Sequence, residues 1–132
     1  MIKNKQHIAF HGLKKTVEWY YNNNGKSHAL EYYKNLSREQ QKKLDRLFML
    51  MANMGEILDS KHFNFEGDKI YAFKLQPDRF FCFFFAGGKV IVTNAYEKKR
   101  DKLIPKEHAK ATLAHEDYVT RVKQGTYYDK KN

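Results

Sequence analysis

The stretch that decides the fold runs from residue 69 to residue 96, KIYAFKLQPDRFFCFFFAGGKVIVTNAY. Its centre, residues 80–85, is apolar at every position, which is typical of a strand covered on both faces. The turn sequences QPD and GG lie on either side of it. Residues 69–75 and 89–96 are therefore expected to pair with the central strand, and the stretch predicts a three-stranded antiparallel meander.

Two helices are expected before the meander. Residues 27–36 have apolar side chains at helical spacing, and Ser37 starts a longer amphipathic helix that Gly55 ends. The letters SREQ at its start fit a capping box, in which the side chain of Gln40 reaches back to the cap. We expect the two helices to form an antiparallel hairpin on one face of the sheet.

The remaining segments complete the predicted order. Residues 16–21, TVEWYY, are β-branched and aromatic and favour a strand. Residues 57–68 are expected to be a connecting loop. A last helix, residues 105–123, either covers the other face of the sheet or leaves it partly open. The ends are expected to be peripheral: residues 1–13 form a leader or an extra edge element, and residues 124–132 form a polar tail.

Length and charge restrict the class of protein. The 132 residues have the size of a single domain, and 25 Lys and Arg against 15 Asp and Glu give a net charge of +10. The sequence thus predicts one α+β domain, residues 1–132, that suits polyanionic partners. The single Cys82 excludes a disulfide framework and a Cys-based zinc site. No apolar run approaches the roughly 20 residues that span a bilayer, and the start does not read as a signal peptide, so we expect a cytoplasmic protein without a membrane partner.

Basic and aromatic positions follow one another in a fixed order through the second half of the chain. The set is KIYAFK at residues 69–74, RFF at 79–81, YEKK at 96–99 and PKE at 105–107. Together they resemble the RelE/ParE toxin superfamily, and within it the HigB-like, phage-derived branch. The resemblance covers about residues 14–122.

The resemblance implies a fold and an activity. The fold is a compact α+β domain with a curved antiparallel sheet, an N-terminal helix hairpin on one face and a C-terminal helix. The activity is that of a type II toxin-antitoxin toxin, an endoribonuclease that cuts messenger RNA on the translating ribosome without a metal or other cofactor. The implied partners are the ribosome, mRNA and a cognate acidic antitoxin that carries a DNA-binding module.

Four residues are candidates for catalysis. Metal-free RNA cleavage needs proton transfer from the 2′-OH and to the leaving 5′ oxygen, and cations that offset transition-state charge. The resemblance assigns Arg79 and Lys98, or Lys99 in its place, to the scissile phosphate. It assigns Lys74 to proton transfer and Tyr96 to stacking on or orienting a base. Neighbouring cations lower one another's pKa, which would suit Lys74 to that role.

Three further residues are candidates for RNA binding: Lys99, Arg100 and His62. Ordinary structural explanations stay open beside the functional ones. Arg79 could be a turn residue paired with Asp78 or Glu66, Tyr96 could be core packing, and the lysines after it could be a solvated charge run.

Two other function classes also remain open. One is a non-enzymatic, gyrase-poisoning ParE-like toxin, and the other is a degenerate relative that merely binds nucleic acid. Ala72 stands where many relatives carry a polar or charged residue, which leaves room for the degenerate relative.

Overall fold

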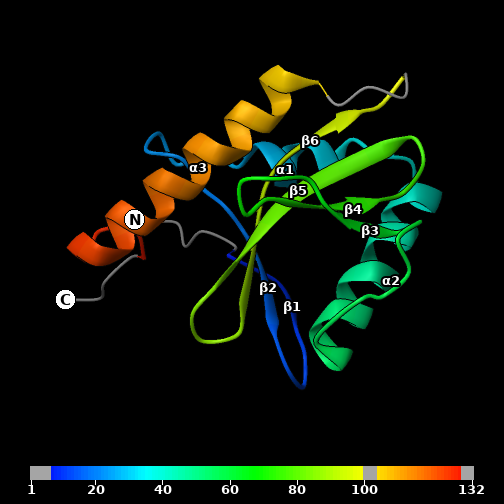
Figure 1. Ribbon diagram of the computed structural model, residues 1–132, viewed down its shortest axis with the longest axis horizontal. Helices are drawn as coiled ribbons and strands as arrows, with labels where there is room; N and C mark the ends of the chain where they lie inside the picture. Colours follow the sequence, from blue (N-terminus) through cyan, green and yellow to red (C-terminus); the bar gives the residue numbers. More distant parts are fainter. Residues whose placement is uncertain (1–6, 100–103, 129–132) are drawn as a thin grey trace.

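The computed structural model describes residues 7–99 and 104–128. Within these residues the chain forms an α+β fold of one six-stranded sheet and three helices (Figure 1). In chain order the elements are β1 (Ile8–His11), β2 (Thr16–Trp19), α1 (His28–Lys34), α2 (Arg38–Met54), β3 (Phe63–Phe65), β4 (Tyr71–Lys74), β5 (Asp78–Phe85), β6 (Lys89–Glu97) and α3 (Pro105–Gln124).

The sheet is mixed, with the strand order β1-β2-β6-β5-β4-β3. Strands β4, β5 and β6 form the predicted antiparallel meander. The expectation of a purely antiparallel sheet is wrong, because β2 runs parallel to β6. Parallel neighbours need a long crossover connection, and residues 20–88, which include the first two helices, supply it.

Two short edge strands complete the sheet. Residues 8–11 pair antiparallel with β2, so this part of the N-terminal segment is the edge element that was one of its two interpretations. The expectation of a loop over residues 57–68 is wrong at Phe63–Phe65, which pairs with β4. A strand of three residues is at the lower limit of strand length, and it is held by its neighbour rather than by a long pattern of its own.

The helices pack on opposite faces of the sheet. In Figure 1, α1 and α2 lie on one side of the sheet and α3 lies on the other. The side chains of Phe80 and Cys82 belong to the core under α1 and α2, whereas Phe81 and Phe83 belong to a second core under α3. Residues 80–83 are therefore covered on both sides, as the sequence predicts, whereas Phe84 is 37% exposed and departs from that prediction. Tyr127, just beyond α3, also lies in the second core. The last helix and the residues after it thus cover the face that could have stayed partly open.

The predicted cap of α2 forms only in part. Ser37 Oγ accepts a hydrogen bond from the Gln40 backbone N–H at 3.1 Å, and Gly55 ends the helix with a φ of +85°. The side chain of Gln40 does not return to the cap, because its Nε2 donates to Asp78 Oδ2 at 2.8 Å. Tyr32 Oη donates to Asp78 Oδ1 at 2.6 Å. The buried Asp78 carboxylate needs donors, and by taking them from α1 and α2 it fixes both helices to the start of β5.

Candidate functional site

Three of the predicted catalytic residues come together at one end of the sheet. Lys74 ends β4, and it lies opposite Arg79 of β5, which in turn lies opposite Tyr96 of β6. Side chains alternate between the faces of a strand. Lys74 is two residues from Ala72 and Arg79 is two residues from Phe81, so both share the α3 face of the sheet with Tyr96.

A β-bulge places Tyr96 in this group. From Phe85↔Lys89 to Cys82↔Val92 the strands β5 and β6 pair regularly, and the register then shifts between Phe80 and Cys82. An unbroken register would have put Ala95 opposite Arg79. The extra residue in β6 brings Tyr96 there instead, in the way that bulges re-aim side chains beside functional sites.

The Lys74 ammonium is enclosed. Its residue is 8% exposed, and Nζ donates to the backbone oxygen of Ser60 at 2.8 Å. With the Asn64 amide turned to satisfy its neighbours, the Asn64 oxygen also accepts from Nζ, at 3.1 Å. Burial lowers the pKa of Lys74, the Arg79 cation lowers it further, and the Glu66 carboxylate opposes both effects. The site therefore favours the neutral amine more than water does.

Arg79 faces a carboxylate. Its Nη1 lies 3.8 Å from Glu66 Oε2, and the side chains of the two residues are 12% and 14% exposed. The sequence had suggested Asp78 or Glu66 as the partner of Arg79, and the structure shows the pair with Glu66. Glu66 is held in the connection between β3 and β4, where its backbone N–H donates to Ile70 O at 2.7 Å.

Tyr96 brings a hydroxyl without a partner. The residue is 5% exposed, and its ring packs against Phe81 with 5.5 Å between centroids. Among the described residues no group hydrogen-bonds its Oη, although the atom is buried. Burial raises the pKa of Tyr96, so the hydroxyl keeps its proton at neutral pH. A buried donor without an acceptor costs free energy, and an oxygen atom of a ligand beside Arg79 would supply one.

The other predicted residues lie around this group or apart from it. Lys98 follows β6, where its backbone N–H donates to Pro77 O at 2.9 Å, and Lys99 is exposed. His62 is exposed on the α2 side of the sheet, and its Nδ1 lies 2.9 Å from Asp59 Oδ2. Arg100 lies outside the described residues.

Two groups of the site, the Ser60 carbonyl and the Asn64 amide, were missed by sequence reasoning, which named Glu66 only as a structural partner for Arg79. The Ser60 carbonyl, the Asn64 amide and the Glu66 carboxylate all come from the segment expected to be a loop. The alternation of apolar and polar residues in Phe63-Asn64-Phe65-Glu66 was the available signal, because it is the period of a strand. It places Asn64 and Glu66 on one face, which is the face of Lys74.

Over residues 7–99 and 104–128, no three or more His, Cys, Asp and Glu side chains gather in a way that could hold a metal ion. No helix in the same ranges is long and apolar enough to cross a membrane.

The fold and the site together define a class: a small basic α+β domain with Lys, Arg and Tyr side chains at the end of its sheet. The chain belongs to the family of phage-derived Gp49-like proteins (DUF891), whose family model matches residues 31–115. This family is part of the RelE toxin-like superfamily. The match includes the four predicted catalytic residues. A search among curated proteins found no significant match.

Proposed function

We propose that the protein is a toxin that cleaves messenger RNA in the A site of the translating ribosome. The observation that carries the proposal is the alignment of Lys74, Arg79 and Tyr96 across three neighbouring strands on one face. An anion-binding guanidinium, an amine with a lowered pKa and an unpartnered hydroxyl are thereby within reach of one bound phosphodiester.

Arg79 binds the scissile phosphate in this proposal. A guanidinium can engage two phosphate oxygens at once. The Glu66 carboxylate holds Arg79 until RNA arrives. The phosphodiester, which carries the same single negative charge but presents two oxygens to the guanidinium, then replaces it. Arg79 thereby offsets the negative charge that accumulates on the phosphorane-like transition state.

The chemical step is an internal transfer of the phosphodiester. The 2′ oxygen attacks phosphorus, the bond from phosphorus to the 5′ oxygen breaks, and a 2′,3′-cyclic phosphate forms. The 2′-OH loses a proton and the 5′ oxygen gains one. Lys74 assists these proton transfers, because its environment lowers the pKa of its ammonium. Tyr96 Oη donates to an oxygen of the bound nucleotide and so orients it.

The basic residues after β6 hold the RNA outside the reacting centre. Lys98, Lys99 and Arg100 continue the chain from Tyr96. A net charge of +10 favours association with ribosomal RNA and with mRNA. The same charge suits inhibition by an acidic antitoxin, and the substrate places the protein in the cytoplasm.

The test is a purified translation reaction in which the 5′ ends of the mRNA fragments are mapped. We expect the wild-type protein to cut within A-site codons. Arg79→Ala should lower the cleavage rate by about 100-fold or more, or roughly 2.7 kcal/mol of transition-state stabilisation. Lys42→Ala is the control, because Lys42 is an exposed cation on α2, which packs on the face of the sheet opposite to Tyr96. Intact mRNA at high concentration of wild-type protein would refute the proposal.

Binding without cleavage is the second candidate. The observation that favours it is the low exposure of the two central cations, 8% for Lys74 and 12% for the Arg79 side chain. Low exposure limits how closely a scissile phosphate can approach them. It predicts salt-dependent RNA binding and uncut mRNA in the same reaction. A gyrase poison would instead leave mRNA intact and damage DNA, and pulsed-field analysis of DNA from expressing cells distinguishes the two.

A further inference from the structure

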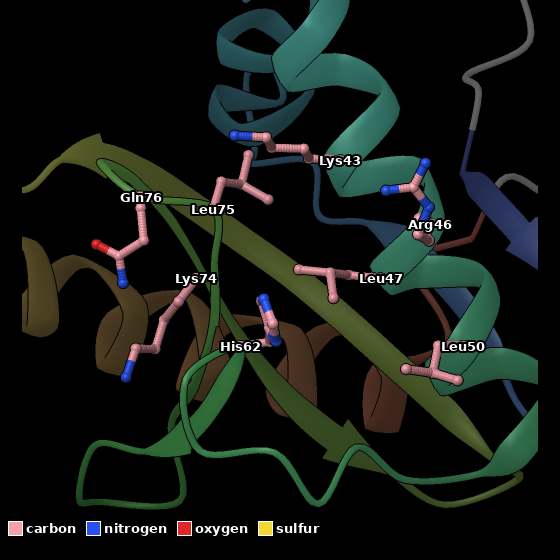
Figure 2. Close-up of a pocket in the computed structure, with 8 residues that line it drawn as sticks. All are labelled: Lys43, Arg46, Leu47, Leu50, His62, Lys74, Leu75 and Gln76. Carbon is pink, nitrogen blue, oxygen red and sulfur yellow. The ribbon is translucent and has the colours of Figure 1, made fainter.

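A groove separates α2 from strand β4 on the face of the sheet opposite to Arg79 and Tyr96. Its volume is about 490 Å³, and its apolar lining is Leu47, Leu50 and Leu75. Figure 2 shows Leu47 and Leu50 pointing from α2 toward His62 and the strand, while the ammonium of Lys74 is directed away from α2. Lys74 itself lines the groove, so the groove adjoins the proposed site, whereas Arg79 and Tyr96 are not among its lining residues.

The apolar stripe continues along α2 beyond the groove. Met54 follows Leu47 and Leu50 at spacings of seven and four residues, which puts the three side chains on one side of the helix. Leu50 is 42% exposed and Met54 is 60% exposed. Leu47 is 8% exposed and belongs to the core, so Leu50 and Met54 are the exposed part of the stripe. Exposed apolar side chains beside a groove on a small, highly charged domain favour an interaction surface.

Cations border the stripe. Lys43 and Arg46 are both exposed and both line the groove on the α2 side. The matching occupant is acidic, which excludes a second copy of this chain, since that copy would carry +10. The chain's own ends are also unsuited, because residues 1–6 have two Lys and no acidic residue, and residues 129–132 have two Lys and one Asp.

The lining favours a protein over RNA. Single-stranded nucleic acids bind on aromatic platforms, whereas this groove presents leucines, with His62 as its one ring among the residues that line it. Helices that dock in grooves do so through apolar side chains at i, i+3 or i+4 and i+7. We propose that the α2–β4 groove binds an acidic amphipathic helix of a partner protein, with apolar residues on Leu47, Leu50 and Met54 and carboxylates on Lys43 and Arg46.

This inference goes beyond the proposed function, because the docking surface excludes Arg79 and Tyr96. A partner bound here would still lie against β4, whose last residue is Lys74. Docking and cleavage can therefore be measured separately. The Arg79→Ala protein should bind the partner helix as the wild type does, even if no RNA is ever cut.

The test uses fluorescence anisotropy of a labelled peptide about 20 residues long, or ~30 Å when helical. The peptide has Leu at i, i+3 or i+4 and i+7 and Glu at most other positions. Leu50→Gln and Lys43→Glu should each weaken binding by about tenfold or more, as expected for central contact residues. Lys42→Glu is the matched control, since Lys42 is the exposed neighbour outside the groove, and it should change the affinity less than about twofold.

Three outcomes would overturn the inference. The first is equal binding of a peptide with Lys in place of Glu. The second is an equal effect of Lys42→Glu and Lys43→Glu, which would mean attraction by net charge alone. The third is RNA of similar length that displaces the peptide and is itself weakened by Leu50→Gln, which would make the groove an RNA site. Circular dichroism checks the folding of each variant, and Met54→Gln, at the more exposed position, replaces Leu50→Gln if the latter unfolds.

Discussion

At the scale of single residues, the burial of the Lys74 ammonium is expected to lower the stability of the folded protein. A buried ammonium is disfavoured relative to the neutral amine, so the pKa of Lys74 is lowered in the folded protein. An amine with a lowered folded pKa binds protons more weakly when folded than when unfolded. The group therefore lowers the free energy of unfolding. The loss is greatest below the folded pKa and disappears as pH rises toward the unfolded pKa of about 10.4. Neutral pH lies well below that unfolded value, so the cost is present there.

This cost predicts that Lys74→Met stabilises the protein while it removes activity. Met has a similar length and no charge to desolvate, so we expect Tm at pH 7 to rise by about 3 °C, the shift that ~1 kcal/mol gives a domain of this size. The gain should shrink as pH approaches 10. Thermal unfolding at several pH values measures both effects. Lys99→Met, at an exposed position, is the control and should leave Tm unchanged. A lower Tm for Lys74→Met at pH 7 would show that its bonds to Ser60 and Asn64 outweigh desolvation.

At the scale of elements, α3 and the residues after it are locked to the sheet by a buried cluster of hydroxyls. Tyr128 Oη donates to Glu18 Oε1 at 2.8 Å and accepts from Lys89 Nζ at 2.9 Å, and Glu18 is 5% exposed. Tyr127 Oη accepts from the backbone N–H of Tyr21 at 3.0 Å. These contacts join the end of the chain to β2 and β6.

The cluster predicts that Tyr128→Phe destabilises the protein by about 1–3 kcal/mol, because it takes a donor from a buried carboxylate and keeps the ring. Urea unfolding measures the change. Tyr33→Phe is the matched control, since Tyr33 Oη donates to Asp45 Oδ1 at 2.7 Å in an exposed position, and its cost should stay within about 0.5 kcal/mol. Equal costs for the two variants would show that the tail contributes no more than a surface contact.

The elements that could be predicted are those whose pattern is local. The two turn sequences define the meander, and Ser37 and Gly55 define α2 through their own backbone geometry. The parallel pairing of β2 with β6 joins segments about 70 residues apart in sequence, and no local pattern specifies its direction. The capping role predicted for the Gln40 side chain failed for the same reason. That side chain donates to Asp78, which is distant in sequence and is brought near only by the tertiary fold.

The candidate site divides in the same way. The tight turn at Pro77 makes the pairing of Lys74 with Arg79 predictable, since the two residues are close in sequence. The position of Tyr96 opposite Arg79 depends on the bulge in β6, which no periodicity reveals. Asn64 and Glu66 depend on the short strand β3. Tyr96 could be predicted as a site residue only from the resemblance to the toxin superfamily, because its spacing in the sequence does not indicate its position.

At the scale of the whole molecule, the question is whether RNA responds to the total charge or to the end of the sheet. Each phosphate contact contributes about 0.7 to the slope of log K against log salt for single strands, whereas distant charges are screened. We expect Lys98→Ala with Lys99→Ala to lower that slope by about 1.4. The measurement uses 2′-O-methyl RNA, which cannot be cut because it lacks the attacking hydroxyl. Lys34→Ala with Lys42→Ala removes the same two charges from exposed positions on α1 and α2, and it should leave the slope nearly unchanged. An equal decrease of the slope in both double variants would mean that RNA is attracted by the net charge of the molecule as a whole. The end of the sheet would then not be the RNA-binding site.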